Sequence, residues 1–231
     1  MSIRDNVEFV LEQVEKAAIR SGRKLSDITV IGATKTQTPD AIDEMVNAGI
    51  KIAGENRVQE ITQKYDMLKT KPAWHMIGHL QSNKIKYIID KVELIHSVDS
   101  LSLLKEINKH AQRINKVMPV LLQVNVSGEE SKFGMKPDEV EGILEQCDGL
   151  NNILVSGLMT IPPKQANPND NILHFCNIFA KYIDIKDKKY NNVSIKHLSM
   201  GMSDDYVQAI ESGATMVRIG TAVFGERQYK N

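Results

Sequence analysis

Short apolar segments alternate with amphipathic, helix-like segments along almost the whole chain, and this alternation restricts the possible fold more than any other feature. Strands are predicted over residues 28–33, 50–54, 74–77, 94–98, 119–126, 153–159, 195–199 and 216–219. Helices are predicted between them near residues 39–48, 56–68, 82–90, 100–115, 137–147, 169–186 and 204–212. Because strands that alternate with helices form parallel sheets, the chain belongs to the α/β class.

Eight strand–helix units favour a closed (β/α)8 barrel of the TIM type, whose usual length is about 250 residues. The 231 residues therefore suit a single domain over 1–231, with an extra N-terminal helix over residues 2–20. An open, doubly wound sheet is the alternative. Such a sheet usually carries a glycine-rich turn after its first strand. Here that turn reads ATKTQTP without a GxGxxG motif, so the barrel is preferred.

The charge balance and the cysteine content exclude several classes of function. Lys and Arg together number 29, as do Asp and Glu, which argues against a nucleic-acid or anionic-membrane partner. Cys147 and Cys176 are far apart and form no CxxC pair, so we expect neither a disulfide framework nor a metal site. The N-terminus has no apolar signal core, and no apolar run approaches the ~20 residues of a membrane span. We expect a cytoplasmic protein.

The loops that follow the carboxyl ends of the strands carry the chemistry of a barrel of this kind. Loops seven and eight are its usual phosphate site, and here they combine small residues with hydroxyl groups. The candidate binding residues at the strand ends are Lys35, Asn56, Ser199, Gly201, Arg218, Gly220 and Thr221. No residue of the set is assigned a catalytic role, and the set contains no carboxylate cluster with metal spacing.

Each of these residues also has an ordinary structural interpretation. Lys35 could be a solvated lysine or one that forms an imine. Arg218, within MVRIG, could pair with an inward-facing acid or bind a ligand, because a buried guanidinium needs a partner. His75 is predicted to be a core residue. Ser203, which precedes two aspartates, is predicted to be the N-cap of the helix over 204–212.

Several long motifs resemble one known family. KIAGENRVQE, WHMIGHLQSNKIKYII, ESKFGM and HLSMGMSDDYVQAIESGATMVRIGTAVFG resemble the signature of the pyridoxal phosphate homeostasis proteins, which are relatives of the alanine racemase barrel domain. The likeness extends over about residues 35–225. It implies a (β/α)8 barrel that binds pyridoxal 5′-phosphate (PLP) and takes part in vitamin B6 and amino-acid homeostasis. The family is not known for robust catalysis.

The resemblance also implies roles for single residues. Lys35 would hold PLP as an internal aldimine, Asn56 would lie beside the cofactor ring, and Arg218 would face the pyridine nitrogen. The phosphate would be held by Ser199, Gly201, Gly220 and Thr221. Two positions depart from the family pattern: Gln37 stands where relatives often have a second lysine, and His79 occupies a variable position. Their roles stay open.

Three functions are compatible with this pattern. The first is a PLP carrier or regulator that acts on amino acids and PLP-free enzymes. The second is a weak PLP-dependent racemase or decarboxylase, and the third is an aldolase-like barrel that uses Lys35 without a cofactor. Arg218 cannot accept the proton of a pyridinium, so the cofactor ring would be a weak electron sink. The sequence ends at Asn231, soon after the eighth strand, so we expect no second catalytic domain and a monomer.

Overall fold

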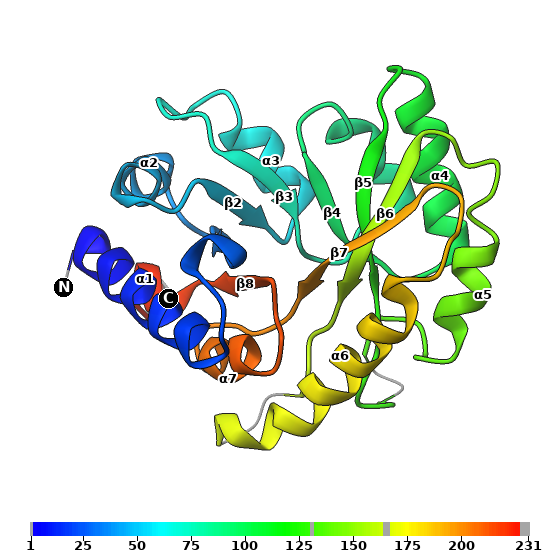
Figure 1. Cartoon of the computed structure of the whole chain (residues 1–231). Coiled ribbons are helices and arrows are strands. Elements are labelled where there is room, and N and C mark those ends of the chain that lie inside the picture. Colours follow the sequence, from blue (N-terminus) through cyan, green and yellow to red (C-terminus); the bar gives the residue numbers. More distant parts are fainter. Residues whose placement is uncertain (1, 130–131, 164–166, 227–231) are drawn as a thin grey trace.

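Eight parallel strands close into a barrel in the computed structural model, which describes residues 2–129, 132–163 and 167–226 (Figure 1). The strands are β1 (Thr29–Ala33), β2 (Ile52–Glu55), β3 (Ala73–Met76), β4 (Leu94–Val98), β5 (Met118–Gln123), β6 (Ile153–Met159), β7 (Val193–Ser199) and β8 (Met216–Ile219). Each strand pairs with the next along the chain, and β8 pairs with β1. The predicted TIM-type barrel is confirmed.

Helices connect successive strands and cover the outside of the barrel (Figure 1). They are α2 (Pro39–Ala48), α3 (Val58–Lys64), the 3-10 helix η2 (Ser82–Tyr87), α4 (Leu101–Gln112), α5 (Glu139–Glu145), α6 (Ile172–Lys186) and α7 (Tyr206–Glu211). Short 3-10 helices η1 (Leu25–Asp27) and η3 (Pro168–Asn171) precede β1 and α6, and α8 (Thr221–Phe224) follows β8. Within the described residues, no helix combines the length and the apolar character needed to cross a membrane.

The connection over residues 82–90 differs from the prediction, because it is a 3-10 helix followed by turns rather than an α-helix. Ile85 and Ile88 are both fully buried, and the Ile88 amide donates to the Ile85 carbonyl at 3.0 Å. Apolar residues three positions apart lie on one face of either kind of helix. The spacing alone therefore does not distinguish between the two.

The N-terminal helix α1 (Ile3–Arg20) packs against α2, α7 and α8 (Figure 1). Ser2 caps it, since its hydroxyl accepts from the Asp5 amide while the Asp5 carboxylate accepts from the Ser2 amide. Its apolar face, which includes Val7, Val10 and Val14, is fully buried. The extra helix thus joins the first and last units of the barrel on their outer side.

Apolar side chains fill the inside of the barrel below the carboxyl ends of the strands. Ile31, Leu94, Leu121, Met159 and Met216 come from five different strands and form one buried cluster in the interior. A larger cluster fills the space between the strands and the helices. Burial of each such side chain stabilises the fold by about 1.5–3 kcal/mol. The polar residues at the strand ends therefore stand on a packed, rigid base.

Helix α6 provides a matched test of the outer core. Phe175 is 0% exposed and Leu173, two residues earlier in the same helix, is 68% exposed. We expect Phe175→Ala to lower the free energy of unfolding by about 3–5 kcal/mol, because it leaves a cavity. Leu173→Ala should change it by no more than about 0.5 kcal/mol. Urea denaturation of the two variants measures both values, and losses of equal size would contradict the packing of α6.

Candidate functional site

The carboxyl ends of the first two strands place Lys35 and Asn56 on the same rim of the barrel. Ala33 of β1 is in register with Gly54 of β2, and Lys35 and Asn56 each follow two residues later. Both side chains are half-buried. Gly78, at the end of β3, packs so closely that a Cβ there would lie 2.4 Å from the Asn56 carbonyl oxygen. The backbone of this rim is therefore tightly fitted around Asn56.

Lys35 lies in a tight turn with an unusual backbone conformation. The Gln37 amide donates to the Thr34 carbonyl at 3.0 Å, so Lys35 and Thr36 are the two central residues of a β-turn. Thr36 has a φ of 66°, at a position where positive values normally belong to glycine or asparagine. A β-branched residue rarely adopts this conformation. The turn that carries Lys35 is thus strained.

The loops after β7 and β8 lie side by side and close the other half of the rim. The Arg218 amide donates to the Gly201 carbonyl at 3.1 Å. Gly201 has a φ of +87°, and a Cβ there would lie 2.5 Å from the Cβ of Ala209, so only glycine fits. A Cβ on Gly220 would lie 3.4 Å from that of Ala33, which places this loop beside the end of β1. The structure therefore brings the two predicted halves of the site together.

Backbone donors of the last loop converge on one oxygen. The amides of Gly220 and Ala222 donate to the hydroxyl oxygen of Ser203 at 3.0 and 3.2 Å. This use of the hydroxyl corrects the prediction that Ser203 is a helix N-cap: α7 begins after Asp205, whose carboxylate accepts from the Met202 amide at 2.7 Å. Converging N–H groups suit an oxygen acceptor, and a phosphate oxygen that used these two would take the place of the Ser203 hydroxyl.

A chain of buried polar side chains crosses the barrel interior from β8 to β3. Arg218, 3% exposed, donates from Nη1 to the Ser199 hydroxyl at 2.5 Å and from Nη2 to the Thr160 carbonyl at 2.9 Å. His96 Nδ1 lies 3.0 Å from the same hydroxyl, and His96 Nε2 lies 3.0 Å from His75 Nδ1. His75 is buried, as predicted, but it belongs to a polar chain rather than to the apolar core.

Burial also determines the charges of these buried polar side chains. It lowers the pKa of His75 to about 3, with a further contribution from His197, and holds the pKa of His96 well below its usual range. Burial lowers the pKa of Arg218 to about 10, which still leaves the guanidinium charged near neutral pH. In the described part of the chain, no carboxylate forms an ion pair with Arg218. The buried Asp205 carboxylate partly offsets the lowering of the Arg218 pKa, so an inward-facing acid does act on Arg218, although not through a direct ion pair.

The neutral imidazoles have one donor and one acceptor each, which lets us assign the protons. The Ser199 hydroxyl donates to His96 Nδ1, and His96 Nε2–H donates to His75 Nδ1. The reverse direction would leave the Ser199 proton without an acceptor among the described residues. Ser199 is fully buried and its hydroxyl serves Arg218 and His96, whereas Thr221 is exposed at the start of α8. A role of Ser199 in phosphate binding stays a prediction.

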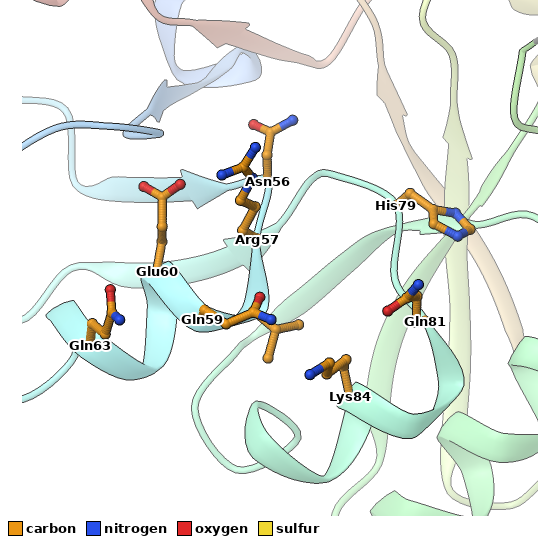
Figure 2. Close-up of a pocket in the computed structure, with 9 residues that line it drawn as sticks. Asn56, Arg57, Gln59, Glu60, Gln63, His79, Gln81 and Lys84 are labelled. Carbon is orange, nitrogen blue, oxygen red and sulfur yellow. The ribbon is translucent and has the colours of Figure 1, made fainter. Parts of the chain in front are cut away.

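A separate cavity of about 550 Å³ lies beside this rim, between α3 and the segment that follows β3 (Figure 2). Asn56, Glu60 and Gln63 line one side, and His79, Gln81 and Lys84 line the other (Figure 2). The His79 ring stacks on Phe133 with a centroid separation of 4.1 Å, and its Nδ1 lies 3.4 Å from the Asp99 carboxylate. Asn56 is the one predicted binding residue that lines the cavity.

Sequence reasoning missed His96, and it considered Ser203 only as a helix N-cap. His96 could have been found, since it lies two residues from Leu94 on β4 and therefore faces the same interior. No local signal shows that Ser203 accepts from a loop 17 residues later. Among the described residues, no group of three or more His, Cys, Asp or Glu side chains could hold a metal ion.

Comparisons with known proteins agree with the fold. Residues 31–228 match the family model of the alanine racemase N-terminal domain. The structure of PipY from Synechococcus elongatus with PLP bound has a TM-score of 0.80 and 30% identity, and the match covers 94% of this chain and 100% of PipY. Alanine racemase of Clostridium difficile, complexed with cycloserine, shares the fold alone: its TM-score is 0.70 at 18% identity, over 98% of this chain and 61% of the racemase. The barrel is thus of the alanine racemase type.

Comparison with curated relatives identifies the family within this class. The pyridoxal phosphate homeostasis protein of Aquifex aeolicus is 47% identical over 232 residues, which cover 99% of this chain and 100% of the relative. The Escherichia coli protein of the same name is 35% identical, over 98% and 97% of the two chains. The chain belongs to the pyridoxal phosphate homeostasis protein family.

The buried histidines predict a dependence of stability on pH. The pKa of His75 falls from 6.5 to about 3 on folding, so below pH 6.5 the unfolded chain binds the proton more readily. The contribution of His75 is therefore present above pH 6.5 and is lost as the pH falls. His75→Gln should remove up to about 1.4 kcal/mol per pH unit from the slope of unfolding free energy between pH 6.5 and about 5. Urea denaturation across this range tests it, and equal slopes would contradict it.

Proposed function

We propose that this chain binds PLP at the rim formed by β1, β2, β7 and β8, with Lys35 as the point of covalent attachment, and acts as a carrier or regulator in PLP homeostasis. The observation that carries the proposal is the placement of Lys35, the buried Arg218 guanidinium and the converging amides of Gly220 and Ala222 on one rim. The names of the curated relatives and the PLP-bound PipY structure support it.

The donors present fit the chemical groups of the cofactor. A guanidinium has five N–H donors, and Ser199 and Thr160 occupy two of those on Arg218, so donors remain for a ring nitrogen. The phosphate would be held by backbone amides around Gly201 and Gly220, by the Thr221 hydroxyl, and by the Ser199 hydroxyl, whose proton would turn from His96 Nδ1 to the phosphate. Asn56 would lie beside the ring. When bound, PLP supplies an aldehyde that reacts with amines and a ring that withdraws electrons.

Arg218 decides how strongly such a ring could withdraw electrons. Its guanidinium only donates, so a ring nitrogen that accepts from it stays unprotonated. The Ser199–His96–His75 chain holds the guanidinium in place and contains no acid that could supply the proton. A weak electron sink favours a carrier or regulator over the alternative, a weak racemase or decarboxylase. We further propose that residues 1–231 form one domain and that the protein works as a cytoplasmic monomer, exchanging PLP with amino acids and PLP-free enzymes.

The attachment point can be tested directly. Borohydride reduction of the PLP-loaded protein, followed by peptide mapping, should find the pyridoxyl group on Lys35, because β1 delivers this lysine to the rim. Lys35→Ala should abolish the visible absorption band of the covalent adduct. Lys84→Ala, which changes a lysine of the neighbouring cavity, should retain it. A label found chiefly on a different lysine would refute the assignment.

Measurement of amino-acid turnover distinguishes the carrier hypothesis from the enzyme hypothesis. With PLP-loaded protein, we expect slow hydrogen–deuterium exchange at the α-carbon of alanine, without inversion, because the ring nitrogen beside Arg218 stays unprotonated. Nuclear magnetic resonance follows the exchange, and chiral chromatography follows the inversion. Exchange with inversion at rates near ~10 s⁻¹, which are typical of enzymes, would instead establish a racemase.

A further inference from the structure

A buried ion-pair network lies directly beneath the turn that carries Lys35. Lys64, at the end of α3 and 8% exposed, donates from Nζ to Glu55 Oε1 at 2.7 Å and to Glu60 Oε2 at 2.7 Å. Its third bond goes to the Thr34 carbonyl at 3.0 Å. Glu55 is fully buried at the end of β2. No part of the proposed cofactor site described above uses these three charged residues.

The same network forms hydrogen bonds with the residues on both sides of Lys35. Before it, the Thr34 hydroxyl donates to Glu55 Oε1 at 2.8 Å, and the Thr34 carbonyl accepts from Lys64. After it, the Thr36 amide donates to Glu60 Oε2 at 2.8 Å. The Asn56 amide donates to Glu55 Oε2 at 3.2 Å. The backbone next to Lys35 and the backbone of Asn56 are therefore tied to one set of charges.

Stability alone is a poor reason for such a network. Buried ions lose hydration, and burial indeed raises the pKa of Glu55 despite the adjacent ammonium group. Apolar side chains of similar size often stabilise a fold as well or better. Thr36, however, holds a φ of 66°, and a strained conformation persists only where its surroundings over-determine it. The network provides the contacts that impose this conformation.

We propose that Lys64, Glu55 and Glu60 are positioning residues that set the strained turn and thereby direct Lys35 at the aldehyde. This proposal rests on the proposed function of Lys35. In the attachment step, Nζ in its neutral form bonds to the aldehyde carbon, Nζ gives up its two protons, and the aldehyde oxygen leaves with them as water. The step depends on the approach of Nζ, and a misplacement of about 1 Å can slow a reaction about 100-fold.

The test uses Glu60→Ala, which removes the acceptor of the Thr36 amide. Two measurements separate positioning from folding. Amide hydrogen exchange at Thr36, measured without cofactor, should accelerate roughly tenfold or more. Stopped-flow absorbance should show attachment of PLP slowed about tenfold or more, while the affinity for pyridoxamine phosphate, which has no aldehyde, stays within about twofold.

Three further variants complete the design. Glu60→Gln keeps an oxygen that accepts from Thr36 and should restore most of the attachment rate. The double variant Lys64→Met with Glu55→Gln removes the two most buried charges together and leaves only the Glu60 carboxylate, whose side chain is 17% exposed, and it should slow attachment as Glu60→Ala does. Glu141→Ala is the control, since Glu141 also accepts from lysine ammonium groups, those of Lys181 and Lys188, but at a site away from the rim.

The outcomes distinguish this proposal from the proposed function. If Glu60→Ala accelerates hydrogen exchange at the Thr36 amide and slows PLP attachment, without changing the affinity for pyridoxamine phosphate, the network positions Lys35. Attachment at the wild-type rate, with or without faster exchange at Thr36, overturns the positioning role and leaves the proposed function intact. If wild-type protein attaches no PLP at Lys35, both proposals fail.

Discussion

The pairing of β8 with β1 is the interaction on which the rest of the structure depends. Thr29 to Gly32 run in register with Met216 to Ile219, and the Thr29 amide donates to the Thr215 carbonyl at 2.8 Å. Closure leaves no sheet edge, and it brings the first strand of the chain beside the last. Without it, Lys35 and Gly220, 185 positions apart in the sequence, would lie at opposite edges of an open sheet.

Two buried cations, Lys64 and Arg218, lie near this rim, and the protein compensates their charges in different ways. Lys64 is paired with two carboxylates, so its ammonium group is already engaged within the protein. Arg218 meets only neutral acceptors, a hydroxyl and a backbone carbonyl, in the described part of the chain. The buried Asp205 carboxylate acts on Arg218 only electrostatically, without a direct ion pair, so an acceptor from a ligand would stabilise the Arg218 guanidinium more than the Lys64 ammonium group. This contrast supports a binding role for the arginine and a positioning role for the lysine.

The elements that the sequence predicted well are those whose pattern is local. Strands 94–98, 153–159 and 216–219 agree with the observed bounds, because uninterrupted apolar runs bounded by turns are typical of buried parallel strands. The predicted fifth strand extended to Val126, but the ladder ends at Gln123, and Val124 instead bridges to Met135 in the following loop. Apolar character continues through both segments, so it cannot indicate where the hydrogen-bonded partner changes.

By itself, the sequence determined the α/β alternation, the eight strands and the positions of Lys35 and Arg218 at their ends, because periodicity and turn residues are local properties. Only the tertiary structure decided what these residues contact. The contact of the Thr36 amide with Glu60, the convergence of loop amides on Ser203 and the row of polar side chains from Arg218 to His75 all join residues from different strand–helix units. Such contacts arise from the closure and register of the barrel, which set side chains from different strands against each other.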